Sequence, residues 1–470
     1  MATCLRSRRD ITLDVVHAVA WQGGSVALAP DALELMDRRY ESFAQLVAAR
    51  VREDPAALIY GVTSAPGDLA RTALSAEQED HRPTQLHTAM SFGQPAPRRV
   101  VRAILLARLA NMVDGHAAVR GRTAQAVADM LELAELPEVP VQGNGGSGEI
   151  LPLGCLFFDL STRLSLTTKE RMALVNGSPC AAALTADAAL AGRGRLELAE
   201  AAFALVADAA GAPDEHFAPE LEELWGDPHE TTELQTLRRL LAGSERLRQP
   251  HQASVSLRIL PRVLGAARRA QVEAERAATV SLSSVTDNPV YVAPDAERPG
   301  GAVYSTGGYH NAQAAPAMDG LAFAHADLCQ LAQRLTDHMF THPQTGPLIG
   351  GDEYTAKPLH MVQNGWAEEA RSLAQPTLLS LGAFGQNDVP ALNFLAWHKT
   401  MAIGNCLDAA LAVLVAVASQ VLHRSGRTPA PGLRPFVAHA RDFFPPVDKP
   451  RPLGRDLQKL TYEFARQVFR

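Results

Sequence analysis

Residues 97–133 read PRRVVRAILLARLANMVDGHAAVRGRTAQAVADMLEL, and apolar side chains recur there every three or four positions over many turns. This spacing predicts helix, because a repeat of about 3.6 residues gathers the apolar side chains on one face. The same pattern occurs in His251–Leu282, Asn311–Phe340, Leu359–Leu381 and Trp397–Leu422. Runs that predict strands are short: VALAP near Val26 and NPVYVAP near Asn288. Several long helices favour an all-α protein, a long-helix bundle whose central members are buried on most faces.

Composition limits the class of protein. The chain has 470 residues, 47% of them hydrophobic, and a net charge of −7 without a long run of one sign. Neither nucleic acid nor a membrane surface is therefore expected as a partner. Five cysteines, odd in number and scattered, favour a reduced, cytoplasmic protein. The first residues contain no apolar signal segment, and LDAALAVLVAVASQVL (Leu407–Leu422) is too short to span a membrane and is expected to be a buried helix.

The segment NGGSGEILPL (Asn144–Leu153) is rich in glycine and interrupts the helical pattern. Together with the preceding glycine it matches the dinucleotide motif G-x-G-x-x-G, but no strand precedes it and no βα alternation surrounds it. A P-loop is excluded because no Lys-Ser/Thr pair follows, and local composition alone favours a turn between helices. The other interpretation is a self-reaction. The amide nitrogen of Gly148 can attack the carbonyl carbon of Gly146, and loss of the Ser147 hydroxyl then leaves an electrophilic methylidene group.

GGSGEILPL (Gly145–Leu153) is one of a series of motifs that follow one another along the chain. The others are ITLDVVHAVA from Ile11, IYGVTSAPG (Ile59–Gly67), LVNGSPCAAAL (Leu174–Leu184), SVSLRILPRVLGA (Ser254–Ala266), SSVTDNPV (Ser283–Val290), STGGYHN (Ser305–Asn311) and FGQNDV (Phe384–Val389). In this order, essentially end to end, they resemble the aromatic amino acid ammonia-lyases, a family of histidine, phenylalanine and tyrosine lyases with related aminomutases.

The resemblance implies a fold, an assembly and a cofactor. The fold is the family's all-α long-helix bundle with a smaller loop-rich N-terminal region, and the assembly is a homotetramer whose active sites are each built by three subunits. Residues 1–190 are expected to carry the catalytic-tyrosine loop and the self-cyclising triad, and residues 191–470 to form the central bundle and the C-terminal helices. The cofactor is 4-methylidene-imidazol-5-one, formed autocatalytically from Gly146-Ser147-Gly148.

The resemblance also assigns roles to three further residues. Tyr60 corresponds to the base that takes a β-proton from the substrate, Asn176 to the amide beside the electrophile, and Arg258 to the cation that binds the substrate carboxylate. Each also has a structural interpretation: a hydrogen-bonded loop tyrosine, an ordinary Asn-Gly turn, and an ion pair within a bundle. A planar guanidinium suits a carboxylate because it binds both oxygens.

Other positions correspond to the substrate pocket of the family. His87 and Thr88 lie where the family selects the substrate side chain, and a histidine at the first of these favours a hydroxylated aromatic amino acid. Gln252, Tyr309 and Asn387 are expected to line the pocket, as is Val255. No metal site is expected, because HMFTH (His338–His342) lacks the glutamate of the H-E-x-x-H motif.

Several residues depart from the family pattern. Gly146 replaces alanine in the triad, and Glu149 is a longer acid in place of aspartate. Val255 stands where the family has a second tyrosine, and Asn387 replaces a glutamate or glutamine. The segment after Tyr60 also lacks the usual N-T-G-F-G. Such losses at one site fit a changed substrate or reaction, or a scaffold that has lost the chemistry.

Three functions therefore remain open from the sequence. The first is an ammonia-lyase that converts an aromatic, in particular a hydroxylated, L-α-amino acid into an α,β-unsaturated acid. The second is an aminomutase that makes a β-amino acid on the same cofactor. The third is a lyase-like protein that binds a small carboxylate or a partner without chemistry, or a lyase without the cofactor.

Overall fold

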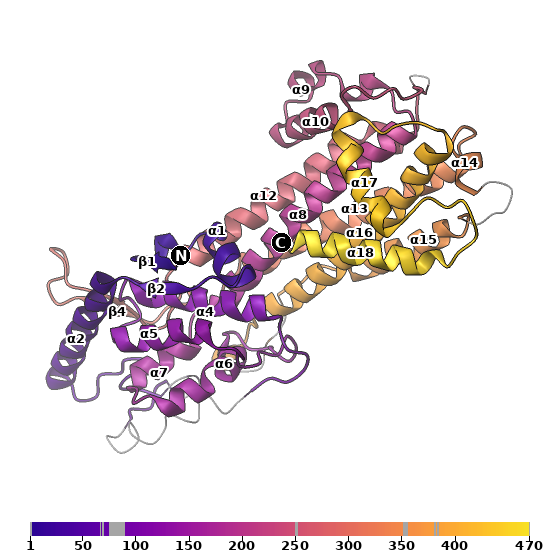
Figure 1. Ribbon diagram of the computed structural model, residues 1–470. Coiled ribbons are helices and arrows are strands. Elements are labelled where there is room, and N and C mark those ends of the chain that lie inside the picture. The colour runs from indigo at the N-terminus through magenta and orange to yellow at the C-terminus, as the bar shows by residue number, and fades with distance from the viewer. Residues whose placement is uncertain are drawn as a thin grey trace. The chain divides into compact units, whose positions relative to one another are not determined.

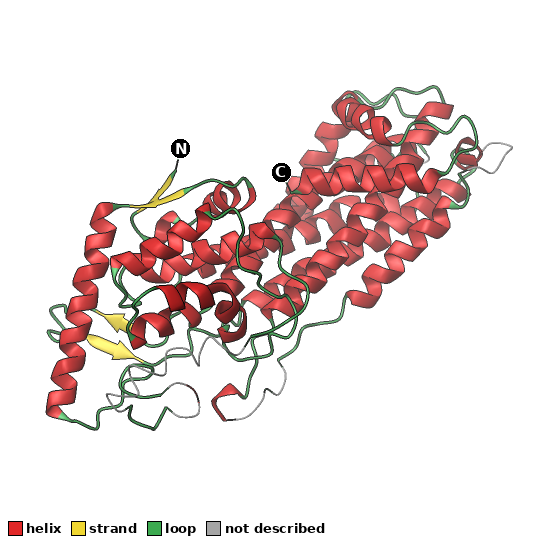
Figure 2. Cartoon of the chain, turned by 60° about the horizontal axis from the view of Figure 1, so that its bottom comes forward, coloured by secondary structure: helices red, strands yellow, loops and turns green. Residues whose placement is uncertain are grey.

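The computed structural model describes residues 2–65, 67, 70–74, 90–249, 252–350, 356–379, 382 and 385–469. Within these residues the chain is mostly helical, as the long-helix patterns predict, and its strands form two small two-stranded sheets (Figures 1 and 2). The chain forms two compact units. Unit 1 comprises Met1–Ala188, Ala274–Ala317 and Thr377–His398, and unit 2 comprises Ala189–Glu273, Met318–Pro376 and Lys399–Arg470. The division into sequence regions 1–190 and 191–470 stays a prediction.

Unit 1 contains short strands and helices of moderate length joined by long loops. In chain order its elements are β1 (Thr3–Leu5), η1 (Arg8–Asp10), α1 (Leu13–Val16), η2 (His17–Trp21), β2 (Val26–Leu28), α2 (Pro30–Glu53), α4 (Arg98–Val113), α5 (Gly121–Asp129), η5 (Met130–Glu132), α6 (Ile150–Arg163), α7 (Thr168–Val175), β3 (Val290–Val292), β4 (Ala302–Tyr304) and η7 (Gly385–Asn387).

The two sheets lie where the sequence predicts strands. β1 pairs with β2 in parallel, and β3 pairs with β4 in antiparallel orientation, so that Tyr291 opposes Val303. The runs near Val26 and Asn288 thus form β2 and β3, whereas their partners β1 and β4 were not predicted. Each of these strands has only three residues, too few for the alternation of polar and apolar positions to stand out.

The quoted stretch 97–133 forms two helices rather than one. α4 ends at Val113, after which Gly115 and Ala118 have φ of +73° and +50°. A right-handed helix cannot continue through left-handed backbone, so the chain turns before α5 begins at Gly121. Helical spacing alone did not reveal this interruption.

Unit 2 consists of helices and their connections. Those contained within it are η6 (Asp214–Phe217), α9 (Glu220–Trp225), α10 (Pro228–Leu241), α11 (Val255–Arg258), α14 (Gly346–Gly350), α15 (Leu359–Leu373), η8 (Pro431–Leu433), α17 (Arg434–Phe443) and α18 (Leu453–Val468). Four long helices have residues in both units: α8 (Pro179–Ala209), α12 (Leu260–Ser283), α13 (Ala314–Thr341) and α16 (Asn393–Arg424).

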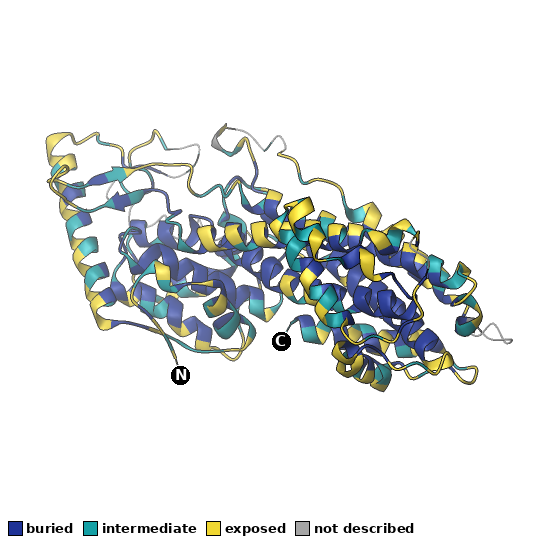
Figure 3. Ribbon diagram, turned by 90° about the horizontal axis from the view of Figure 1, so that it is seen from above, coloured by how far each residue is buried: buried dark blue, intermediate teal, exposed yellow. Residues whose placement is uncertain are grey.

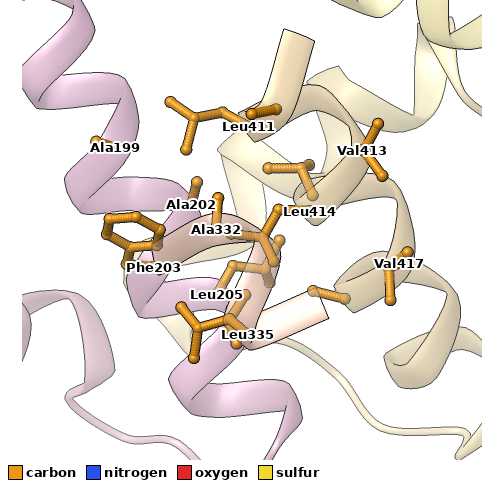
Figure 4. Close-up of a cluster of buried hydrophobic side chains, with 14 of the residues drawn as sticks. Ala199, Ala202, Phe203, Leu205, Ala332, Leu335, Leu411, Val413, Leu414 and Val417 are labelled. Carbon is orange, nitrogen blue, oxygen red and sulfur yellow. The ribbon is translucent and has the colours of Figure 1, made fainter. Parts of the chain in front are cut away.

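Unit 2 contains an extensive apolar cluster, and it also buries charged groups such as the ion pair of Arg195 with Asp408. Figure 4 shows Phe203 and Leu205 of α8, Leu335 of α13, and Leu411 and Leu414 of α16 gathered in one cluster. Figure 3 shows the same division in both units, with buried residues on inner helices and exposed residues on outer helix faces. Burial of this apolar surface is the main stabilising contribution in such a bundle.

Among the described residues, α16 is the one helix whose length and hydropathy would allow it to cross a membrane. Its most apolar window is 89% buried, as expected of a core helix in a large protein. Helices α2 and α8 were absent from the predicted set. The first part of α8 and the two residues before it (177–192) are all buried. No polar stripe therefore marks the helical repeat there.

Candidate active site

The Gly-Ser-Gly triad lies in a tight turn just before α6. Gly143 has φ of +73°, a conformation that glycine adopts without strain. Asn144 closes the turn, because its Nδ2 donates to the carbonyl oxygen of Pro140 at 2.8 Å. This hydrogen bond fixes the start of the glycine-rich loop, and the triad that follows is held by further contacts.

Two hydrogen bonds fix the triad to the chain around Asn387. The Oγ of Ser147, which is only 6% exposed, donates to Asn387 Oδ1 at 2.8 Å. The backbone N–H of Ala391 donates to the carbonyl oxygen of Gly146 at 2.9 Å. The loop is thus anchored at a side chain and at the backbone, through two oxygen atoms of adjacent residues.

A pocket of about 280 Å³ opens beside the triad, within unit 1. It is lined by Tyr60, Gly67, Ser147, Gly148, Glu149, Ile150, Val175, Asn176, Asn288, Ser305, Thr306, Gly307, Tyr309 and Asn387. Six residues predicted for the site from the sequence are among them. They come from five separate stretches of sequence, so the fold brings together residues that no local pattern connects.

Tyr60 is held by the loop that follows it. The backbone N–H of Gly67 donates to the Tyr60 hydroxyl oxygen at 3.0 Å. Gly61 has φ of +61°, and a Cβ there would lie 2.8 Å from Cγ of Met172. A side chain at position 61 would therefore both strain the backbone and push against α7. The altered segment after Tyr60 still returns a donor to the phenol.

Asn176 ends α7, and its side chain is bonded at both atoms. Its Nδ2 donates to the carbonyl oxygen of Asn288 at 2.8 Å, and its Oδ1 accepts from the N–H of Gly177 at 2.8 Å. Gly177 has φ of +82°, and a Cβ there would lie 3.0 Å from Thr286 Oγ1. Gly177 thus allows the chain to change direction directly after α7, and Asn176 lines the pocket.

Glu149 joins the triad loop to the first turn of α8. Its two carboxylate oxygens accept the N–H groups of Cys180 at 2.6 Å and Ala181 at 2.7 Å. Burial raises the pKa of Glu149 to about 7, while these two bonds and the charge of Arg108 oppose the rise. A helix N-terminus favours a carboxylate, so the longer acid still has a defined anchoring role.

Further charges lie buried behind the pocket. Arg108 of α4 is fully buried and donates through Nη1 to the carbonyl oxygen of Asn176, and burial lowers the pKa of Arg108. Lys169 pairs with Asp287 at 3.0 Å, with both side chains almost fully buried. Burial also lowers the pKa of Lys169. Asp287 Oδ1 in turn accepts the N–H of Asn288, so the ion pair supports a pocket residue.

The sequence did not point to these supporting residues. Arg108 interrupts the apolar run ILLARLANM, and an arginine so placed is a usable signal, because an isolated charge inside an apolar helix needs partners. Lys169 and Asp287 are 118 positions apart in the sequence, and nothing local relates them. Ser305 and Thr306 of the pocket wall lie in a predicted motif but were not singled out.

Three predicted site residues belong to unit 2 and are not among those that line the pocket. Gln252, Val255 and Arg258 are all exposed, Val255 to 57%. Among the described residues, no acidic group forms an ion pair with Arg258. His87 and Thr88 lie outside the described residues.

The model of the family "Aromatic amino acid lyase" matches residues 11–163 and 158–442. The chain belongs to this family. Its members include histidine and tyrosine ammonia-lyases, so the chain is classed with enzymes that act as carbon–nitrogen lyases.

Named relatives and solved structures extend over nearly the whole chain. The histidine ammonia-lyase of Symbiobacterium thermophilum is 28% identical over 96% of this chain and 94% of its own length. The tyrosine ammonia-lyase of Cereibacter sphaeroides is 29% identical over 98% and 97%. By fold the chain is similar to the ergothioneine-degrading ergothionase of Treponema denticola, with a TM-score of 0.88 and 16% identity over 100% of this chain and 99% of that one. It is also similar to the tyrosine aminomutase of Streptomyces globisporus, with a TM-score of 0.87 and 21% identity over 100% of this chain and 98% of that one.

The residues of the triad fit the cyclic group that the family implies. Gly148 lies beside Tyr309, since a Cβ added to this glycine would lie 3.6 Å from Cδ2 of the tyrosine, at ordinary van der Waals distance. A Cβ on Gly146 would lie 3.2 Å from the carbonyl oxygen of Gly148, so the two ends of the triad are already close. An alanine at this position, as is usual in the family, would require this oxygen to move by a few tenths of an ångström.

Proposed function

We propose that the protein is an ammonia-lyase that removes ammonia from an aromatic L-α-amino acid and releases an α,β-unsaturated acid. The observation that carries the proposal is the pocket itself, in which Tyr60, Ser147, Gly148 and Asn176 meet. The cofactor we propose is 4-methylidene-imidazol-5-one from Gly146-Ser147-Gly148, which supplies an electrophile for the substrate amine. No metal enters this proposal.

Tyr60 is the proposed base for the β-proton. The N–H of Gly67 donates to its hydroxyl oxygen, and a donor at this position stabilises negative charge on the phenolate. Asn176 is fixed in the pocket wall, since its amide donates to the carbonyl oxygen of Asn288, which also lines the pocket. A fixed amide costs no reorganisation when charge develops beside it.

The substrate carboxylate is assigned to Arg258. This residue is exposed on unit 2 without a described acidic partner, and the described residues that line the pocket within unit 1 include no arginine or lysine. We therefore propose a homotetramer in which Arg258, Gln252 and Val255 of one subunit complete the pocket of another. His87 and Thr88 are proposed to meet the substrate side chain, with His87 favouring a hydroxylated ring.

The localisation follows from the thiols. All five cysteines, Cys4, Cys155, Cys180, Cys329 and Cys406, are free. Free thiols in a protein of this size suit a reducing compartment, so we propose that the enzyme is cytoplasmic.

The test is product analysis with a panel of amino acids. Purified protein is incubated with tyrosine, phenylalanine and histidine, and both ammonia and the unsaturated acid are measured. Equal amounts of the two products support the lyase. A β-amino acid in the chromatogram would instead identify an aminomutase, and no product from any aromatic amino acid or histidine would contradict the proposal.

A further inference from the structure

The short segment Asn387–Ala391, here called the maturation segment, contacts the triad at two atoms. Ala391 N–H donates to the carbonyl oxygen of Gly146, and Asn387 Oδ1 accepts from the hydroxyl of Ser147. Formation of the proposed cyclic group requires the loss of two oxygen atoms from the triad. The two oxygens that the segment binds are the same two.

The chemistry of cyclisation identifies what each oxygen needs. In the first step the amide nitrogen of Gly148 bonds to the carbonyl carbon of Gly146, and negative charge develops on the carbonyl oxygen. That oxygen then leaves as water with the two amide protons of Ser147 and Gly148, and a C=N bond remains. In the second step Oγ of Ser147 leaves as water with the Cα proton, which creates the exocyclic double bond. Atoms balance without an oxidant or a further reactant.

We propose that the maturation segment promotes this self-reaction. The inference rests on the proposed function, because it assumes that the triad cyclises. Ala391 N–H acts on the first step, since a backbone donor on a carbonyl oxygen polarises the carbonyl and stabilises the developing oxyanion. Asn387 is a positioning residue for the second step, because its amide oxygen holds the Ser147 hydroxyl in one rotamer and thereby fixes the Cβ–Oγ bond against the Cα proton.

The surroundings of the segment suit this role. Ser147 is 6% exposed and Ala391 is 8% exposed, so water has little access to the serine hydroxyl or to the residue that donates to Gly146. The segment is tied down in turn, because Nε2 of His310 lies 3.3 Å from the carbonyl oxygen of Pro390. A donor that is already in place costs no reorganisation when the charge appears, and this is the condition for a large effect on rate.

Both contacts end when the reaction ends. The two oxygens leave as water, so neither hydrogen bond can exist in the mature protein. Asn387 is then released to face the pocket that it lines. The glutamate or glutamine that the family resemblance implies at this position has a longer side chain. The shorter asparagine places its amide oxygen at hydrogen-bonding distance from the Ser147 hydroxyl.

The experiment follows the mass of the Asn144–Leu153 peptide with time after cell-free synthesis and acid quenching. Ala391→Pro deletes the N–H, and Ala391→Gly is its matched control because it keeps the donor. Asn387→Leu deletes the acceptor, and Asn387→Asp restores an oxygen at the same distance. Circular dichroism of each variant establishes that the helical fold is retained.

The proposal predicts a different accumulated species for each variant. In Ala391→Pro the full encoded mass persists, with maturation slowed about a hundredfold, whereas Ala391→Gly matures like the wild type. In Asn387→Leu a peptide lacking one water accumulates, because the second loss of water is slowed about tenfold. In Asn387→Asp this intermediate peptide does not accumulate. Because Asn387→Leu tests the second step alone, it decides the matter even if Ala391→Pro does not fold.

Two results would overturn the inference, and they differ. If the wild type loses two waters and folded Asn387→Leu and Ala391→Pro do so equally fast, the segment has no part in maturation while the proposed function stands. If the folded wild type keeps its encoded mass, cyclisation itself is absent and both proposals fail.

Discussion

The pocket of unit 1 and the core of unit 2 are stabilised in different ways. The pocket walls are loops and helix ends, backed by the buried charges of Arg108, Glu149, Lys169 and Asp287. The unit 2 cluster around Leu411 consists of aliphatic, aromatic and sulfur-containing side chains, and the charges of Arg195 and Asp408, buried in the same unit, pair with each other. In a helix the backbone satisfies its own hydrogen bonds, so apolar side chains suffice to pack it. In a loop the N–H and carbonyl groups need partners, and charged side chains supply them.

This difference has a consequence for function. Glu149 binds two backbone N–H groups, Arg108 binds a carbonyl, and Asp287 binds the N–H of Asn288. Each of these charges holds the main chain of a segment that reaches the pocket. Buried charges are costly, and their presence beside the triad indicates that loop geometry takes precedence over stability there.

Ser147→Ala is the strongest test of the unit 1 side of this comparison. The change removes the hydroxyl that must leave, so the methylidene group cannot form. We expect deamination to fall by roughly a thousandfold or more, the scale of losing a covalent catalyst. Thermal unfolding should change little, because among the described residues this hydroxyl hydrogen-bonds to Asn387 alone. Activity near the wild-type level would remove the triad from the mechanism.

Lys169→Met isolates one buried charge pair behind the pocket. It leaves Asp287 buried without its cation, which typically costs about 3–5 kcal/mol in the free energy of unfolding. Urea unfolding measures this loss. The double variant Lys169→Met with Asp287→Leu should recover most of the stability. We expect its triad peptide not to lose the two waters, because the hydrogen bond from the Asn288 N–H to Asp287 is gone. A double variant as unstable as the single one would contradict this account.

Leu411→Ala measures the unit 2 core in the same way. Leu411 is fully buried in the apolar cluster, so truncation should lower the free energy of unfolding by about 2–5 kcal/mol. Leu224→Ala is the matched control, because Leu224 is 75% exposed and should cost less than about 0.5 kcal/mol. Folded Leu411→Ala should still lose two waters. Failure to do so would show that maturation depends on this core.

The smallest predicted effect is a pH dependence in unit 1. Burial raises the pKa of Glu170, but hydrogen bonds from Arg120, Thr167 and Thr123 outweigh it and lower the pKa from 4.5 to about 2. A pKa that is lower in the folded than in the unfolded chain stabilises the fold at pH values above the unfolded pKa. This contribution is lost as the pH falls from about 4.5 towards 2. Compared with Glu170→Gln, the wild type should be more stable at neutral pH by roughly 1–2 kcal/mol, allowing for solvent screening. A stability difference that does not change between pH 5 and pH 2 would contradict the assignment.

Much of the helical fold was predictable from the sequence because apolar periodicity reports amphipathic helices directly. It found α13 and α16 closely and missed α8, whose buried residues 177–192 show no polar face. Motif order placed Tyr60, Ser147 and Asn176 in one site, and the pocket brings them together. The contacts of Ala391 and Lys169 were not predictable, because a backbone N–H carries no sequence signal and an ion pair between distant positions depends on the fold.

The most direct test of the central claim is the mass of the peptide that contains Asn144–Leu153, taken from purified protein whose helical fold has been verified. The account predicts a mass lower than encoded by two waters, with the whole deficit in this peptide. The encoded mass, found in folded protein, would contradict it, because Gly146-Ser147-Gly148 would then be a turn and not the source of an electrophile.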